Sequence, residues 1–271
     1  MVDGRLSAPL LDLGTAPEDS ASILEDECRR LSVDAPALKR VIAALERSGD
    51  LDRIVDGLVS RDRELQLRSV RLTGALRHEP AVPWLEPLLA SSQPRLRTAV
   101  ARALGRIGGG RASHALVRGL GWRRGSTMRL VLELARAAPD LYLEAGLVDP
   151  QHQRLRPYFL LATGLRRRRT ALPTLLALLE TGTRPERALS ARAIGWIGAV
   201  EVGDALGYAL SDPEWQVRNA AAKALGDLVG VADAELDFSV LDRNARVRKT
   251  TEATLRRRRM STGRQRVMTW R

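Results

Sequence analysis

The sequence predicts an all-α protein that is built from a repeated helical hairpin. The octet Ala101–Gly108 returns almost unchanged at Ala191–Gly198, and a shortened form stands at Ala222–Leu228. A fixed period of about thirty residues is typical of stacked repeats, in which each unit buries its apolar face only against its neighbours. No stretch alternates with period two for long enough to indicate a strand. We therefore expect about seven to eight helical hairpins in one elongated array.

One glycine of the octet marks the register of the repeat. It stands at Gly74, Gly105, Gly164, Gly195 and Gly226. Neighbouring markers are 31 residues apart, except that Ala135 marks one further unit between Gly105 and Gly164. A glycine inside a helix costs about 1 kcal/mol relative to alanine. Its recurrence in phase therefore predicts that a neighbouring helix packs closely against it.

Each unit has two segments with helical patterns. In the unit that starts near Asp212, apolar residues from Val217 to Leu228 recur at three- and four-residue spacing, as on one face of a helix. Asp212 is predicted to act as the N-cap, and Pro213 to occupy the first helical position. The second segment carries apolar residues four positions apart, for example Val202, Leu206 and Leu210.

The repeats are expected to fill residues 19–260. An acidic leader, 1–18, precedes them, a capping helix is expected at about 20–31, and a basic tail, 261–271, is expected to be disordered. The predicted units lie near residues 34–60, 61–92, 93–122, 123–152, 153–181, 182–211, 212–241 and 242–260.

The segment Asp212–Gly226 resembles a HEAT repeat of the short type found in bacterial PBS-lyase-like HEAT proteins. The resemblance covers roughly residues 34–260. It implies a right-handed α-α superhelix, with the first helices on the convex side and the second helices on the concave side. It also implies a structural ladder between arginines and loop aspartates, for which the candidates are Arg97, Asp212, Arg218, Asp242 and Arg248. The unit around Ala135 lacks both the glycine and the arginine of the pattern.

The composition restricts the class of protein. The single cysteine, Cys28, excludes an internal disulfide, so a reducing compartment is expected. The first residues do not have the basic-then-apolar pattern of a signal peptide, and apolar runs such as Leu175–Leu179 are too short to span a bilayer. We expect a soluble, cytoplasmic protein.

The net charge of +12 favours an acidic or polyanionic partner. Basic residues concentrate on either side of the irregular unit around Ala135. There we predict a partner-binding surface made of Trp122, Arg123, Arg124, Arg154, Arg156, Arg166, Arg167, Arg168 and Arg169. An ordinary interpretation competes with it, because arginine-rich solvated helix faces are common where a GC-rich genome encodes the protein. The run Arg256–Arg259 also suits the dipole at the end of a helix.

The sequence contains no evident catalytic motif. The three histidines, His78, His114 and His152, are dispersed, so no metal site is predicted. The run Gly108–Gly110 lacks the lysine and the preceding strand of a phosphate-binding loop, and no cofactor is predicted. HEAT-like alkylpurine DNA glycosylases need aromatic residues beside a carboxylate, whereas aromatic residues make up 4% of this chain. Bilin attachment is suggested only by the name of the family.

These observations favour a non-catalytic scaffold or adaptor that binds a macromolecular partner, in particular a protein with an acidic surface. Two alternatives stay open. The first is a basic HEAT-like protein that binds nucleic acid, and the second is docking of the basic tail on an anionic membrane. No small-molecule substrate is indicated.

Overall fold

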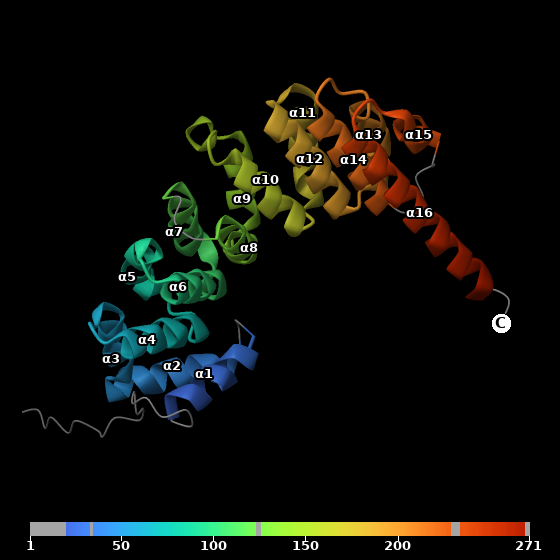
Figure 1. Ribbon diagram of the computed structural model, residues 1–271. Coiled ribbons are helices and arrows are strands. Elements are labelled where there is room, and N and C mark those ends of the chain that lie inside the picture. The colour runs from blue at the N-terminus through green and yellow to red at the C-terminus, as the bar shows by residue number, and fades with distance from the viewer. Residues whose placement is uncertain (1–19, 33–34, 123–125, 229–233, 269–271) are drawn as a thin grey trace, which may run out of the picture. The chain divides into compact units, whose positions relative to one another are not determined.

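The chain folds into helices joined by short turns. The structure, a computed structural model, describes residues 20–32, 35–122, 126–228 and 234–268. Within these ranges it contains α-helices and single turns of 3₁₀ helix, and no strand (Figure 1). The predicted all-α fold of helical hairpins is therefore confirmed. No helix in the described part of the chain has both the length and the apolar composition that a membrane span needs.

The chain divides into two compact units, an N-terminal unit, Met1–Pro139, and a C-terminal unit, Asp140–Arg271. The repeat period predicted one continuous array, so the division into two compact units differs from that prediction. It falls inside the irregular interval 123–152.

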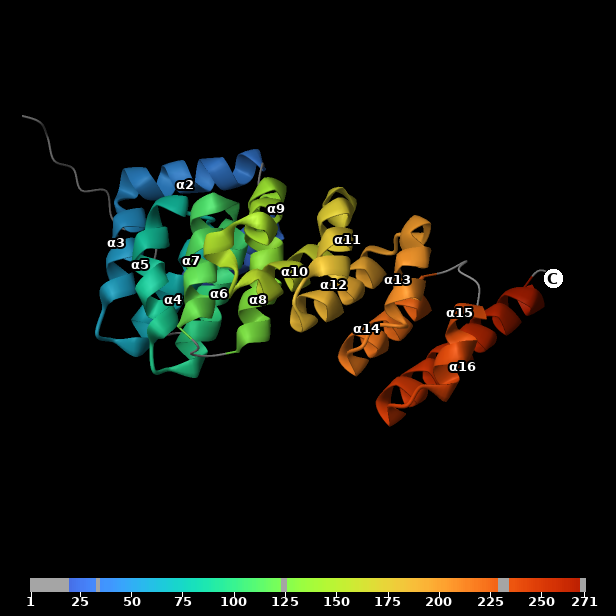
Figure 2. The ribbon, with the colours of Figure 1, turned by 90° about the horizontal axis from the view of Figure 1, so that it is seen from above.

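In the N-terminal unit, a longer first helix alternates with a shorter second segment. The first helices are α2 (Pro36–Ser48), α4 (Arg63–Ala75), α6 (Pro94–Ile107) and α8 (Thr127–Ala137). The second helices are α3 (Asp50–Asp56), α5 (Val82–Leu85) and α7 (Gly109–Gly121). Helices α4, α6 and α8 lie side by side (Figures 1 and 2). The predicted capping helix is α1 (Ser20–Arg30), which packs on α4.

The C-terminal unit repeats the arrangement. Its first helices are α10 (Arg156–Leu165), α12 (Arg184–Ile197), α14 (Trp215–Asp227) and α16 (Ala245–Met268), and each packs on the next (Figure 2). Its second helices are α9 (Asp140–Val148), α11 (Leu172–Thr181), α13 (Gly203–Ala209) and α15 (Ala234–Asp237). Helix α16 continues to Met268, so much of the tail that was expected to be disordered is helical. The predicted leader, 1–18, lies outside the described residues.

The marker glycines permit the close stacking of first helices. A Cβ atom added to Gly195 would lie 2.7 Å from the Cα of Ala224 on the next first helix. The same construction places a Cβ on Gly164 at 2.7 Å from the Cα of Ala193. Both distances are shorter than any normal contact, so a side chain would force the helices apart. The close packing that the sequence predicted is confirmed.

In the irregular unit around Ala135, a glutamate packs against the marker glycine of the preceding repeat. A Cβ atom on Gly105 would meet the side chain of Glu133 in α8, with the Cβ of Glu133 3.0 Å away. Glu133 is only 3% exposed, and its carboxylate lies 3.3 Å from the guanidinium of Arg136. A buried, charge-paired glutamate thus occupies the place that alanine holds in the regular repeats.

Helix α9 packs against α10, the first of the stacked first helices in the C-terminal unit. Gly146 of α9 faces the fully buried ring of Phe159 in α10, and any side chain at Gly146 would collide with that ring. His152 completes the cluster, with its ring centroid 5.2 Å from that of Phe159. This aromatic packing gives the C-terminal unit a core that includes α9.

Candidate partner-binding surfaces

A ladder of arginines and carboxylates joins successive repeats of the C-terminal unit. Arg218 donates from Nε and Nη2 to the two carboxylate oxygens of Asp242, at 2.6 and 3.0 Å. Its Nη1 donates to the backbone carbonyls of Asp212 and Pro213, at 2.8 and 3.0 Å. Both partners of the ion pair are almost fully buried, with side chains 6% and 8% exposed. One guanidinium therefore holds its own loop and the loop of the next repeat.

Asp212 belongs to the preceding rung. Arg187 donates to its two carboxylate oxygens at 2.8 and 3.0 Å, and also donates to the carbonyl of Gly182 at 3.0 Å. Asp212 accepts the backbone N–H of Glu214 at 2.8 Å, and α14 begins at Trp215. The expected N-cap is thus wrong by two residues, because Asp212 closes a turn that precedes the helix.

The role of Arg187 in the ladder was not predicted, because the candidates were found as Val-Arg or Leu-Arg dipeptides and a glutamate precedes Arg187. The repeat spacing would have predicted it, since Arg156, Arg187 and Arg218 are each 31 residues apart. Arg156 donates to Glu186 at 2.7 Å, so it forms an equivalent rung with a different acid.

Two other predicted ladder arginines donate to a backbone carbonyl of their own loop but do not reach a carboxylate of the next repeat among the described residues. Arg248 donates to the carbonyl of Asp242 at 2.8 Å, and Arg97 donates to the carbonyl of Ser91 at 2.6 Å. Among the described residues, neither forms an ion pair with a carboxylate. For Arg97 the sequence explains this, because Gly121 and Trp122 stand where the next aspartate would be.

The ladder shifts the pKa values of its carboxyl groups. The hydrogen bond from Arg218 lowers the pKa of Asp242 and outweighs the opposing effect of burial. Burial raises the pKa of Asp212, but the hydrogen bonds from Arg187 and from the backbone of Glu214 outweigh it and leave the pKa lowered. Both carboxylates are therefore held in the ionised form.

Most described members of the predicted binding surface are committed to ion pairs within their own unit. Arg166 and Arg168 both reach Asp140, at 3.0 and 2.7 Å. Arg169 pairs with Glu201. With Arg156 bound to Glu186, these guanidinium groups serve structural contacts.

The remaining members of the predicted surface are scattered. Arg154 and Arg167 are exposed, and among the described residues no carboxylate pairs with either. Trp122 belongs to the N-terminal unit, where the guanidinium of Arg118 lies 5.9 Å from its ring centroid. Arg123 and Arg124 lie outside the described residues.

The basic run of α16 is also used structurally. Arg257 pairs with Asp227 at 3.0 Å, and Arg258 donates to the carbonyl of Leu228 at 2.9 Å. These contacts place positive charge on the C-terminal end of α14, where the helix dipole favours it.

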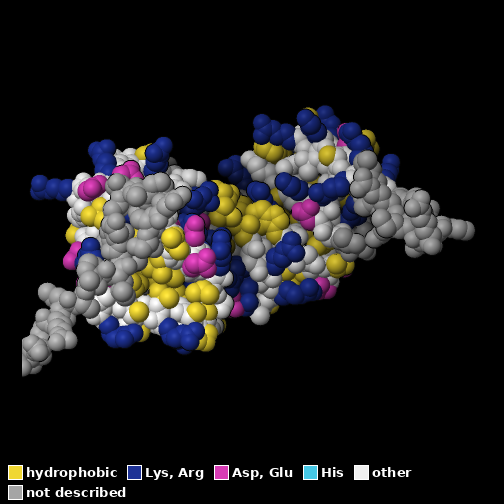
Figure 3. All heavy atoms as spheres, turned by 90° about the horizontal axis from the view of Figure 1, so that it is seen from below, with side chains coloured by type: hydrophobic (Ala, Val, Ile, Leu, Met, Phe, Trp, Pro, Cys, Tyr) yellow, Lys and Arg dark blue, Asp and Glu magenta, His cyan; other side chains and the backbone are white. Residues whose placement is uncertain are grey.

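A second group of arginines, which the sequence analysis missed, gathers on the N-terminal unit. We call it the N-terminal arginine face and define it by Arg29, Arg71, Arg102, Arg106 and Arg136. Its members come from α1, α4, α6 and α8, four helices that pack in sequence. Figure 3 shows dark blue basic side chains spread over the described surface of each unit, with few magenta acidic ones among them.

The charges of this face repel one another. Burial lowers the pKa of Arg106, and the positive charges of Arg136 and Arg102 lower it further, while the negative charge of Glu133 acts in the opposite direction. Burial likewise lowers the pKa of Arg29, with further lowering by Arg106, Arg71 and Arg102. Besides burial, the neighbouring positive charges therefore contribute to the lowered pKa of both groups.

Within the part of the chain that the structure describes, no carboxylate forms an ion pair with Arg71, Arg102 or Arg106. At the edges, Arg29 pairs with Asp26 at 3.2 Å, and Arg136 pairs with the buried Glu133. The face therefore keeps a net positive charge.

The sequence contains a pattern that could have predicted this face, namely arginines that recur at the spacing of the repeat. Arg71 and Arg102 are 31 residues apart, and Arg106 and Arg136 are 30 apart. Stacking of the first helices turns that spacing into adjacency, but no run of consecutive arginines reveals it. Leu132, 30 residues after Arg102 and 42% exposed, continues the same row with an apolar side chain.

A family model described as HEAT repeats matches residues 51–135, 142–226 and 172–256, which together make up more than half of the chain. The chain belongs to the HEAT repeat family. Among curated protein sequences, none matches this HEAT-repeat chain at a significant level.

Three solved structures are similar to the HEAT-repeat chain. Human deoxyhypusine hydroxylase in complex with glycerol is 20% identical, with a TM-score of 0.37, over 86% of this chain and 96% of that one. Two engineered proteins are 19% and 20% identical, with TM-scores of 0.38 and 0.31. The match to the first engineered protein spans 89% of this chain and 75% of that one. The match to the second spans 76% of this chain and 95% of that one. Similarities of this strength have no bearing on function.

Proposed function

We propose that this HEAT-repeat protein is a non-catalytic scaffold that binds an acidic surface of another protein through the N-terminal arginine face. The observation that carries the proposal is a row of three guanidinium groups on the consecutive first helices α4 and α6, at Arg71, Arg102 and Arg106, which form no ion pair among the described residues. In most of the other basic clusters, carboxylates or carbonyls of the same unit already bind the arginines. Repulsion within the row would be relieved by carboxylates from a partner.

The composition of the face favours a protein partner. Arginine, methionine and aromatic side chains are enriched at protein interfaces, whereas lysine is depleted. The chain has three lysines, and Leu132 and Met128, which are 42% and 47% exposed, lie on α8 beside the face. Because helices hold these side chains, association costs less ordering entropy than binding by a flexible loop.

Nucleic acid is the second candidate, because a guanidinium binds phosphate as well as carboxylate. The salt dependence separates the two. Binding to duplex DNA should weaken with a log–log slope of about −0.9 for each phosphate that is neutralised.

Fluorescence anisotropy tests the proposal with two probes, a labelled peptide of glutamate and leucine and a labelled DNA duplex. We expect the peptide to bind, and expect the variant with Arg71, Arg102, Arg106 and Arg136 all changed to serine to bind it at least about ten-fold more weakly. The matched control changes Arg166, Arg167, Arg168 and Arg169 to serine and should lose less than about three-fold. Equal loss in both variants would contradict the assignment to the N-terminal face. Tighter binding of DNA than of peptide at about 0.15 M salt would favour the second candidate.

A further inference from the structure

The second helices of the C-terminal unit carry charge opposite to that of the whole chain. The sequences of α9, α11, α13 and α15 contain no lysine or arginine, although the net charge of the chain is +12. Their acidic residues are Asp140, Glu144, Glu180, Asp204, Glu235 and Asp237. The basic residues of this unit lie on its first helices and loops. The second-helix side therefore selects for a different kind of partner from the arginine face.

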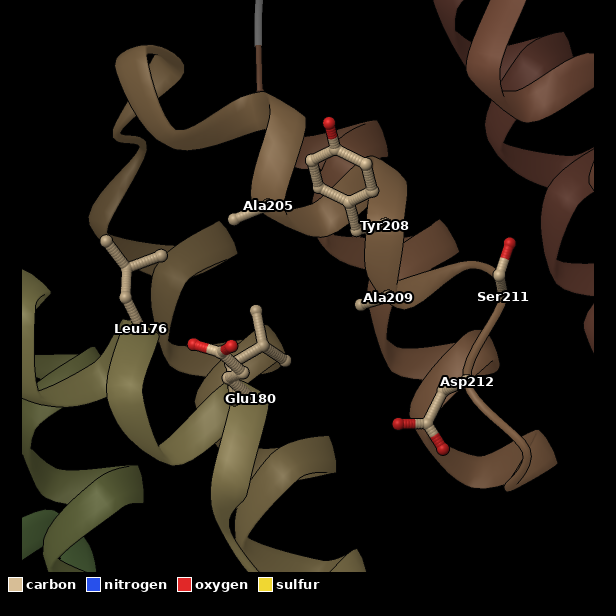
Figure 4. Close-up of a pocket in the computed structure, with 8 residues that line it drawn as sticks. Leu176, Glu180, Ala205, Tyr208, Ala209, Ser211 and Asp212 are labelled. Carbon is tan, nitrogen blue, oxygen red and sulfur yellow. The ribbon is translucent and has the colours of Figure 1, made fainter.

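A hollow of about 570 Å³ lies between α11 and α13 on this side (Figure 4). Leu176, Leu179 and Ala209 supply its apolar lining, and Glu180 and Asp212 supply carboxylates. In the close-up, the carboxylate of Glu180 and the ring of Tyr208 come from the two neighbouring helices and flank the space.

Tyr208 presents its ring to solvent. It is 83% exposed in the last turn of α13, whereas most aromatic side chains are buried to a greater extent. Asp204 is one turn earlier on the same face of α13 and is also exposed. Tyr208 therefore contributes little to the core, and its ring face is available to a ligand.

The two carboxylates of the hollow differ in their availability. Asp212 is already bound by Arg187 through two hydrogen bonds. For Glu180, no hydrogen bond or ion pair exists among the described residues, and the side chain is exposed. The hollow therefore has an unpaired negative charge beside an open aromatic ring, and its lining contains no cation.

We propose that this hollow binds a lysine or arginine side chain from a basic segment of a partner protein. The cation would lie over the ring of Tyr208 and pair with the carboxylate of Glu180, two interactions that favour guanidinium and ammonium groups. The methylene stem would pack on Leu176 and Leu179, as the stems of long basic side chains do on apolar surface. Charge complementarity excludes an acidic or phosphorylated segment. This site lies on the C-terminal unit and does not depend on the N-terminal arginine face.

Anisotropy titration of a labelled glycine-serine peptide that carries two arginines tests the proposal on the full chain. The reference probe is the same peptide with citrulline in place of arginine, which keeps the shape and removes the charge. We expect the arginine peptide to bind at least about five-fold more tightly. Tyr208→Ser and Glu180→Gln should each remove most of that difference. Their matched controls, Leu241→Ser and Asp237→Asn, change exposed residues outside the hollow and should leave it intact.

Three results would overturn the proposal. The first is equal binding of the arginine and citrulline peptides. The second is unchanged binding by Tyr208→Ser and Glu180→Gln, which are surface changes that leave the fold in place. The third is concentration-dependent self-association in sedimentation velocity that Tyr208→Ser abolishes, because the occupant would then be a second copy of the chain.

Discussion

Gly195 of α12 lies against Ala224 of α14 so closely that a Cβ atom on the glycine would stand 2.7 Å from both the Cα and the Cβ of that alanine. The same relationship joins Gly74 to Ala103 and Gly164 to Ala193. The repeat therefore fixes the distance between neighbouring first helices by the absence of a side chain. The proposed N-terminal arginine face runs across several first helices, so its geometry depends on this spacing.

Replacing Gly195 by leucine should destabilise the protein by roughly 1–3 kcal/mol through overpacking, although leucine forms helices better than glycine. The measurement is the midpoint of urea unfolding. Gly110→Ala is the control, because nothing lies within 4 Å of a Cβ at that position. An unchanged midpoint for Gly195→Leu would show that the register is wrong.

Replacing Arg218 by alanine should cost about 3–5 kcal/mol, because it leaves the buried carboxylate of Asp242 without its partner. Arg256→Ala removes an exposed arginine that pairs with Glu252 and should cost less than about 1 kcal/mol. Urea unfolding of the two variants compares a buried rung with a surface pair. Similar losses in both would contradict the structural role of the ladder.

The lowered pKa values of Asp212 and Asp242 predict a loss of stability in acid. A carboxyl group whose pKa is lower in the folded state stabilises the fold above its unfolded pKa, about 3.9 for aspartate, and this contribution disappears as pH falls through the folded value. The free energy of unfolding should therefore decrease below about pH 4. In a variant with both Asp212→Asn and Asp242→Asn, the decrease should be smaller. An identical pH profile in that variant would argue against ladder control of acid stability.

Cys28 should react slowly with thiol reagents in the native protein. It lies on the buried side of α1 and is 1% exposed, in a cluster with Leu38, Leu45 and Ile54, and burial raises the pKa of its thiol. Absorbance with a chromogenic disulfide reagent should show full reaction only in urea. Rapid reaction without denaturant would mean that α1 does not stay docked on the N-terminal unit.

The sequence was sufficient for the parts of the fold that depend on local pattern. Periodic apolar residues predicted the hairpins, and the in-phase glycines predicted the close packing at Gly164 and Gly195. The division between Pro139 and Asp140 was not predicted, because it depends on which helices share a core. The sequence did reveal the irregular unit, residues 123–152, in which the division falls.

The binding surfaces were harder to predict because they depend on pairing between repeats. The run Arg166–Arg169 looked available in the sequence, yet Asp140, 26 residues before Arg166, binds two of its members. Arg71 and Arg102 looked like ordinary solvated arginines until stacking made them neighbours. A run of consecutive arginines was therefore a poorer predictor of a surface with unpaired positive charge than arginines at equivalent positions of neighbouring repeats.

Co-purification from the native cell tests the proposed partner-binding role of the N-terminal arginine face most directly. The tagged chain would be compared with the serine variant at Arg71, Arg102, Arg106 and Arg136, and with the control at Arg166–Arg169, by quantitative mass spectrometry. We predict one or more acidic proteins that the chain and the control retain and that the first variant loses. Retention of every partner by the first variant, or loss of the same partners by the control alone, would contradict the account.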